Sequence, residues 1–201
     1  MARVAVLAGA GLLALGPSTA AWAATISINP GNVPTTAAGF DTHACEKNQG
    51  GGPLEDYGIY GLQSALYLTG ELPESISATT FRPIGDPRFA EIFAHVSSQL
   101  RFPSGAVAQL VTSYDSAGGN IALVRGTAGT LIMDPATSYA GQKMRVEGTN
   151  GAEFTPGDPM VQFARQLDHL ADAIRDGAQI RTPGEMGLRD ARLIEAIYAS
   201  A

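Results

Sequence analysis

Residues 50–70, with the sequence GGGPLEDYGIYGLQSALYLTG, decide how the rest of this chain is interpreted. Three glycines interrupt whatever precedes them, and Pro53 suits the first turn of a helix, where its missing N–H costs nothing. The acidic pair that follows is stabilised by the positive end of the helix dipole. An apolar helical pattern continues to Gly70, which is a natural stop. The pattern therefore predicts a helix over residues 53–69.

Asp56 and Tyr60 are four residues apart on this predicted helix, so their side chains share one face, with about 5–6 Å between the Cβ atoms. A carboxylate and a phenol placed together can bind a hydroxylated ligand and move a proton. The alternative is an ordinary amphipathic helix with a charged first turn, and the spacing by itself favours that alternative.

The stretch also resembles the start of the C-terminal domain in the glucose–fructose oxidoreductase and inositol dehydrogenase (Gfo/Idh/MocA) family, where the pattern is G-G-G-x-L-x-D-x-G-x-H/Y. The residues that fit this pattern are Gly50, Gly51, Gly52, Leu54, Asp56, Gly58 and Tyr60. Tyrosine at the last position is similar to the glucose–fructose oxidoreductase branch. The resemblance continues in order through 101–105 (RFPSG), 131–137 (LIMDPAT), 166–171 (QLDHLA) and 181–185 (RTPGE).

The resemblance implies that residues 50–201 form a sugar-binding and oligomerisation domain. It implies that Asp56 orients the sugar by accepting hydrogen bonds and that Tyr60 exchanges a proton with the reacting hydroxyl. The family's reaction is hydride transfer between NAD(P) and a sugar carbon, which requires a cofactor-binding half with a glycine-rich phosphate loop. Residues 24–49 are too few for such a half, so we expect this chain to lack it.

Lys47 raises the question of a third catalytic residue. Cys45-Glu46-Lys47 resembles the family's C-E-K-P motif, whose lysine is catalytic, but Asn48 replaces the proline and no apolar strand leads in. Coincidence is the favoured interpretation, and a displaced remnant of the motif is the alternative. A phenol ordinarily has a pKa near ~10, so a proton-transferring tyrosine needs a nearby cation at neutral pH. Without that cation, Asp56 and Tyr60 make up only part of a catalytic site.

Two hypotheses for function follow, and the sequence supports both. The chain is the sugar-binding half of an NAD(P)-dependent sugar oxidoreductase, inactive by itself or working with a separate Rossmann-domain chain. Alternatively, it is a non-enzymatic exported sugar-binding or scaffold domain. A truncated gene product is a third possibility. In each case we expect no binding of NAD(P) by this chain alone, although its ligand would be a sugar or polyol.

The pattern of residues 1–23 is typical of a secretory signal peptide. Arg3 precedes an apolar run of about a dozen residues, too short to span a bilayer comfortably, and Ala21-Trp22-Ala23 is a small-x-small cleavage pattern. An uncleaved anchor is the alternative. Cleavage would make Ala24 the first residue of an exported, periplasmic or secreted protein. Residues 24–49 lack periodicity and predict a flexible arm or loop.

Composition limits the remaining functions. The net charge of −6 and the pI near 5.0 argue against a nucleic-acid surface, because no basic stripe is present to neutralise phosphates. The three histidines and the single cysteine lack the spacing of metal ligands.

The hydrophobic period changes to two after the first helix and returns to 3.6 near the end. Six strands are predicted, over 75–81, 91–102, 106–114, 120–125, 130–133 and 142–147. Helices are predicted over 158–176 and 184–200, giving an α+β fold with a mostly antiparallel sheet of about five or six strands and all helices on one face. The predicted inward residues of the 158–176 helix are Phe163, Leu167, Leu170, Ala171 and Ile174. The uncovered sheet face, carrying Phe93, His95, Gln99 and Arg101, is predicted to join a second subunit.

Overall fold

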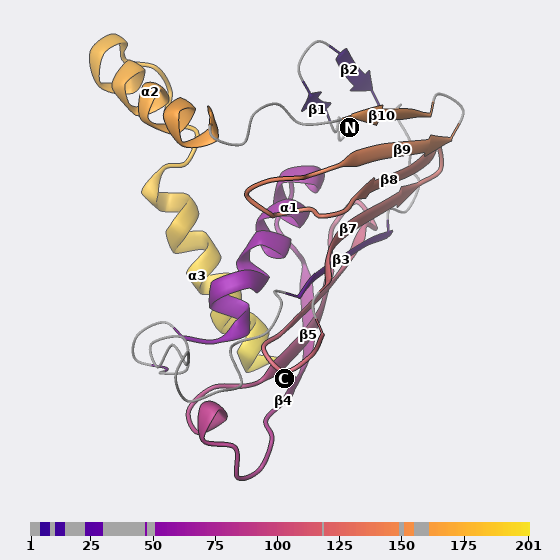
Figure 1. Ribbon diagram of the computed structural model, residues 1–201, viewed down its shortest axis with the longest axis vertical. Helices are drawn as coiled ribbons and strands as arrows, with labels where there is room; N and C mark the ends of the chain where they lie inside the picture. Colours follow the sequence, from indigo (N-terminus) through magenta and orange to yellow (C-terminus); the bar gives the residue numbers. More distant parts are fainter. Residues whose placement is uncertain are drawn as a thin grey trace.

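Figure 1 shows the computed structural model, which describes residues 5–8, 11–14, 23–29, 47, 51–117, 119–148, 151–154 and 161–201. The strands of its main sheet are β3 (Ala23–Asn29), β4 (Ser75–Phe81), β5 (His95–Arg101), β6 (Val107–Ser113), β7 (Gly119–Gly126), β8 (Gly129–Met133), β9 (Met144–Gly148) and β10 (Ala152–Phe154). Their order is β10-β9-β8-β7-β3-β6-β5-β4. Among the described residues of this sheet, β3 and β6 are the only parallel neighbours, and all other neighbouring strands are antiparallel. This confirms the predicted α+β fold with a mostly antiparallel sheet. Near the N-terminus, β1 (Ala5–Ala8) and β2 (Gly11–Ala14) pair with each other in a separate sheet.

The strand β3 corrects the expectation of a loop over 24–49. It lies in the middle of the sheet, between β6 and β7, with paired neighbours along both edges. The segment Thr25-Ile26-Ser27-Ile28 is rich in β-branched residues, and its backbone groups are satisfied on both sides by the two hairpins. Apart from Lys47, the rest of the predicted arm lies outside the described residues.

The prediction of a strand over 91–102 is wrong for its first four residues. A short 3-10 turn, Pro87–Phe89, is followed by bends, and β5 begins only at His95. The alternation assumed for residue 93 therefore does not hold. Phe93 stacks on Tyr198 with ring centroids 5.7 Å apart, so it packs with the helices and not on the uncovered face.

The core lies between the sheet and the helices α1 (Ile59–Thr69) and α3 (Gly184–Ala199), which lie side by side in Figure 1. Alternate residues of β5, including Val96 and Leu100, are fully buried against them. Leu62 of α1 and Ile197 of α3 are likewise fully buried. The predicted helix over 53–69 is therefore confirmed as the element that covers the middle of the sheet.

The two last helices agree with the predicted ranges but not with all the predicted faces. In α3, Ile197 is buried as expected, whereas Leu188 is 53% exposed. The buried residue in that part of the helix is Asp190. Its carboxylate forms an ion pair with Arg189 and accepts a hydrogen bond from the side chain of Gln63. The side chain of Gln63 is hydrogen-bonded to both members of this ion pair and so ties α1 to α3.

Helix α2 (Val161–Asp176) shows the largest difference from expectation. The four large residues predicted to face inward are exposed, at 51% for Phe163, 69% for Leu167, 49% for Leu170 and 79% for Ile174, and Ala171 is exposed too. No residue of α2 is buried, and in Figure 1 the helix stands apart from the sheet. Helical periodicity correctly predicts the apolar stripe, but it does not determine whether the same chain covers it.

Candidate functional site

The candidate site is built on a π-helical turn, Leu54–Gly58, that runs directly into α1. Leu54 and Gly58 are buried on the sheet side of this turn, which leaves Asp56 exposed on the other side. Thr112 of β6 fixes the start of the turn by donating a hydrogen bond of 2.8 Å to the carbonyl of Pro53. Wider π-helical turns are rare and are often found at functional sites.

Two glycines of the predicted motif are required by the geometry of this turn. Gly52 has φ +136°, and a Cβ there would collide with the Glu55 carboxylate. Gly58 approaches its neighbours so closely that a Cβ would lie 2.7 Å from Leu54 Cδ1 and 3.1 Å from Thr112 Cγ2. The glycines therefore allow the helix start to lie against the sheet.

Asp56 is held in place by Tyr114 at the end of β6. The buried Tyr114 hydroxyl lies 2.8 Å from Asp56 Oδ2, to which it donates, and 3.1 Å from the carbonyl oxygen of Gly52. Since a carboxylate has about four acceptor positions, Asp56 keeps acceptor capacity on its exposed side for the hydroxyls of a ligand. The Tyr114 contact joins residues far apart in sequence, and no local pattern predicts it.

Tyr60, in the first turn of α1, is 47% exposed. The half-buried Tyr57 links the group: burial raises the pKa of its phenol, and the charges of Asp56, Tyr60 and Tyr139 raise this pKa further. Both predicted site residues are therefore within electrostatic reach of Tyr57. Asp56 lies in the π-helical turn and Tyr60 in the first turn of α1, and both are exposed. Their shared face and their catalytic and substrate-binding roles stay predictions.

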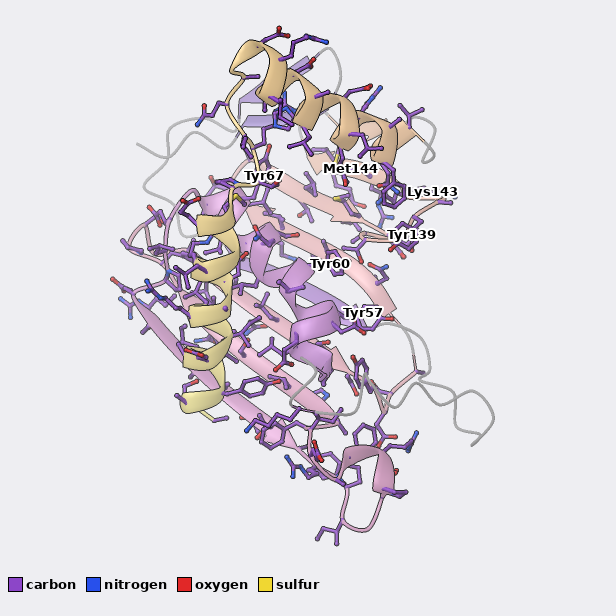
Figure 2. All side chains as sticks on the ribbon, turned by 90° about the vertical axis from the view of Figure 1, so that its left-hand side faces the viewer. Tyr57, Tyr60, Tyr67, Tyr139, Lys143 and Met144 are labelled. Atoms are coloured by element: carbon purple, nitrogen blue, oxygen red, sulfur yellow. The ribbon has the colours of Figure 1, made fainter. Side chains whose placement is uncertain are left out.

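Tyr57 and Tyr139 are candidate site residues that sequence reasoning did not identify. Figure 2 shows Tyr57 of the π-helical turn and Tyr60 of α1 on the same side of the molecule as Tyr139 and Lys143, which belong to the connection from β8 to β9. Tyr139 is 71% exposed, and its ring lies 5.8 Å from that of Phe163 in α2. The spacing of Tyr57 and Tyr60, three residues apart at the start of the helical segment, was a usable signal, but the position of Tyr139 depends on the tertiary fold.

Glu55 faces away from this group and anchors the C-terminal helix. The Tyr198 hydroxyl donates a hydrogen bond of 2.7 Å to Glu55 Oε2. Burial raises the pKa of Glu55, and the hydrogen bond from Tyr198 and the charge of Lys47 oppose that rise. Burial, together with the nearby Glu55, also raises the pKa of Tyr198. The Glu55 carboxylate thus occupies the space above Gly52.

Lys47 lies near two glutamates, Glu91 and Glu55. Its backbone N–H donates to Glu91 Oε2 at 3.2 Å, and its charge acts on Glu55. Cys45 and Glu46, the other residues of the possible motif, lie outside the described residues. His169, by contrast, is described: its Nε2 accepts a hydrogen bond of 3.1 Å from the backbone N–H of Arg181.

Within the described ranges, no cluster of three or more histidine, cysteine, aspartate or glutamate side chains is arranged to hold a metal ion. None of the helices described is both long enough and apolar enough to cross a membrane.

Comparisons with a family model and with curated proteins point to the same protein family. The sequence model described as the GFO/IDH/MocA C-terminal domain matches residues 31–152, more than half of the chain. The chain is 28% identical over 173 residues to D-xylose 1-dehydrogenase (NADP(+)) 2 of Haloferax volcanii, a match that covers 81% of this chain and 50% of that protein. It is 31% identical over 161 residues to the dTDP-3,4-didehydro-2,6-dideoxy-alpha-D-glucose 3-reductase of Streptomyces antibioticus, covering 76% and 46% respectively.

Solved structures agree with the sequence comparisons. The crystal structure of the aldose-aldose oxidoreductase from Caulobacter crescentus, complexed with glycerol, superimposes with a TM-score of 0.79 and 37% identity. This match covers 91% of the present chain and 53% of that enzyme. The chain therefore spans about half the length of the relatives it matches.

Proposed function

The chain belongs to the GFO/IDH/MocA oxidoreductase family, and from this premise we propose that it is the sugar-binding half of an NAD(P)-dependent sugar oxidoreductase. The observation that carries the proposal is the exposed Asp56 carboxylate, oriented by Tyr114. The ring of Tyr57 packs edge-on against that of Tyr114, and Tyr60 follows Asp56 by four residues and is 47% exposed. Asp56 accepts hydrogen bonds from sugar hydroxyls, and Tyr60 exchanges a proton with the reacting hydroxyl. The aromatic faces beside them provide apolar contact for the sugar ring.

The nicotinamide cofactor comes, in this proposal, from a second domain or chain. A dinucleotide pyrophosphate binds to backbone N–H groups at a glycine-rich helix start. Here the space that the missing Cβ of Gly52 leaves is filled by the Glu55 carboxylate, and Asp56 follows directly. Two carboxylates at this helix start do not fit a pyrophosphate. The chain alone therefore binds sugar without binding NAD(P).

Calorimetric titration of the purified chain with D-xylose and D-glucose tests this function. We expect weak binding, with Kd on the order of millimolar, that is lost in Asp56→Asn and reduced in Tyr60→Phe. Asp168→Asn, an exposed aspartate on α2, is the matched control and should bind sugar normally. Sugar binding that persists unchanged in Asp56→Asn would refute the proposed site. Saturable NADPH binding in a fluorescence titration would refute the assignment of the cofactor to another domain.

We also propose that the uncovered face of the sheet joins a second copy of the chain. His95, Gln99 and Arg101 project from this face, and Gln99 pairs with Gln109 at its centre. Half-buried Val107 and Val111 of β6 lie in register with the same row. Sedimentation of the chain at tens of micromolar should show a dimer or larger species that Gln99→Arg weakens. A strictly monomeric chain would contradict this proposal.

Export of the chain remains a proposal that rests on the sequence of residues 1–23. Cleavage there would leave Ala24 as the first residue, within one residue of the start of β3. Mass spectrometry of protein from the extracytoplasmic fraction should find this N-terminus. Recovery of an intact Met1 from that fraction would contradict cleavage.

A further inference from the structure

The side chain of Asn120, near the start of β7, is hydrogen-bonded to the loop 134–143 that connects β8 to β9. Its Oδ1 accepts from the backbone N–H of Ala136 at 3.2 Å, from the backbone N–H of Thr137 at 2.9 Å and from the Thr137 hydroxyl at 3.0 Å. Its Nδ2 donates to Ser138 Oγ at 3.2 Å. One amide side chain therefore holds three successive residues of the loop.

The end of this loop that adjoins the sheet is closed by backbone hydrogen bonds. The N–H of Ala136 donates a bond of 2.7 Å to the carbonyl of Asn120, and the N–H of Asp134 donates one of 3.0 Å to the carbonyl of Lys143. Ala136 is also buried in the hydrophobic core beside the sheet. These contacts close the loop at the sheet without the side chain of Asn120.

Tyr139 follows directly after the three residues that Asn120 holds. Its side chain is 71% exposed, and its ring lies 5.8 Å from that of Phe163 in α2. Burial raises the pKa of the Tyr57 phenol, and Tyr139 is close enough to add to that rise. Figure 2 shows Tyr139 on the same side of the molecule as Tyr57 and Tyr60. The loop thus brings an exposed aromatic ring to the border of the candidate site.

The amide of Asn120 acts on the part of the loop that carries this ring. Thr137 and Ser138 are half-buried polar residues outside the core clusters, and they immediately precede Tyr139. Because most of the Tyr139 side chain is in contact with water, packing restrains its ring only weakly. The hydrogen bonds of Asn120 to the two preceding residues therefore determine where the backbone presents the ring.

We propose that Asn120 is a positioning residue for sugar binding, which fixes the loop 134–143 so that Tyr139 borders the site of Asp56 and Tyr60. The inference rests on the proposed function, because it assumes a sugar held by Asp56. Asn120 itself does not touch the sugar. It acts by ordering the loop before the ligand arrives, which lowers the entropic cost of binding.

Two substitutions at Asn120 in the full chain test this role. Asn120→Ala removes the side-chain bonds to the loop. Asn120→Asp keeps the shape and the acceptor oxygen, and the Ser138 hydroxyl can turn to donate, so this conservative variant should restore the native behaviour. Gln179→Ala, which removes an exposed amide between α2 and α3, is the matched control.

Three measurements compare the variants with the native chain. Hydrogen exchange followed by NMR reports on the Thr137 amide, and the nuclear Overhauser effect reports on the ring contact of Tyr139 with Phe163. Calorimetric titration with D-glucose reports on sugar binding. The first two measurements need no sugar, so they test the loop independently of the proposed function.

We expect Asn120→Ala to speed exchange of the Thr137 amide by about tenfold, since its hydrogen bond is lost, and to weaken the contact of Tyr139 with Phe163. Sugar binding should weaken by about threefold to tenfold. Asn120→Asp and Gln179→Ala should stay close to the native chain in all three measurements. Unchanged exchange and an unchanged ring contact in Asn120→Ala would overturn the proposal, and so would unchanged sugar affinity in that variant.

A double-mutant cycle separates positioning of Tyr139 from a general structural role of Asn120. The variant Asn120→Ala/Tyr139→Ala should bind sugar as Tyr139→Ala does, because the ring that Asn120 positions is already absent. Additive losses of affinity would show that Asn120 acts by another route and would overturn the proposal. Absence of sugar binding by the native chain would refute the proposed function and its consequence for sugar affinity, while exchange and the ring contact still decide whether Asn120 fixes the loop.

Discussion

Helices α1 and α2 both carry apolar stripes at helical spacing, but only α1 buries its stripe within this chain. Leu62, Ala65 and Leu66 of α1 are at most 5% exposed, whereas the four stripe residues of α2 are at least 49% exposed. The difference shows that periodicity reports an apolar face and leaves open what covers it. In this chain, the covered helix supports the candidate site and the uncovered helix borders it.

The largest difference in stability is expected between two ion pairs, one in the packed region of α1 and α3 and the other in α2. Asp190, 2% exposed, joins Arg189 and Gln63 between α3 and α1, while the side chains of Asp172 and Arg175 in α2 are 51% and 69% exposed. We expect Asp190→Ala to lower the free energy of unfolding by about 2–4 kcal/mol, because the mutation strands a partly buried arginine. Asp172→Ala should cost less than about 1 kcal/mol. Urea denaturation of both variants measures the difference, and equal losses would contradict the contrast.

A second test concerns the close approach of the π-helical turn to β6. In Gly58→Ala, the new methyl group would meet Leu54 and Thr112, both fully or almost fully buried, so neither can move away easily. We expect a loss of about 1–3 kcal/mol from overpacking, despite the better helix propensity of alanine. Gly187→Ala in α3 is the control: open space surrounds that position, so the same change should stabilise by up to about 1 kcal/mol. Thermal unfolding that ranks the two variants in the reverse order would show that the turn is loosely packed.

These two regions also show what could be predicted from the sequence. The helix over 53–69 and the hairpin of β5 and β6 follow from short-range spacing, and the structure reproduces them. The assignment of Phe93 to the open face failed because one bend changes the parity of every residue before β5. The strand β3 was missed because a short segment after an apolar leader carries little periodic signal. The contact of Tyr114 with Asp56 depends on the tertiary fold, which no local pattern contains.

Glu55 provides a smaller, pH-dependent test of the packed region. Burial raises the pKa of Glu55 above its ordinary 4.5, so the folded state binds this proton more tightly than the unfolded chain does. Stability is therefore lost as the pH rises through the window from 4.5 up to the raised value. Glu55→Gln removes that cost and keeps an acceptor for Tyr198, so it should be more stable than the native chain at neutral pH.

The gain in Glu55→Gln should stay below about 1 kcal/mol, since partial contact with water screens the cost, and it should vanish below pH ~4. Chemical denaturation at several pH values measures it. Glu195→Gln, at an exposed position of α3, should show no such pH dependence. A gain for Glu55→Gln that is the same at acidic and neutral pH would mean that burial of the carboxylate is not its cause.

Leu170→Ala in α2 should have the smallest effect, and for that reason it tests the comparison most directly. Replacing a buried leucine by alanine typically costs about 2–5 kcal/mol, because a cavity is left. Leu170 is 49% exposed and belongs to a helix without buried residues, so its removal should change the free energy of unfolding by no more than about 0.5 kcal/mol. Leu62→Ala in α1, a fully buried position with the same change of side chain, is the matched reference and should show the full cavity cost. If Leu170→Ala instead costs as much as Leu62→Ala, the stripe of α2 is covered within the chain or by a second copy of it. Repeating the measurement over a tenfold range of protein concentration separates these two cases, since only an intermolecular contact makes the apparent stability depend on concentration.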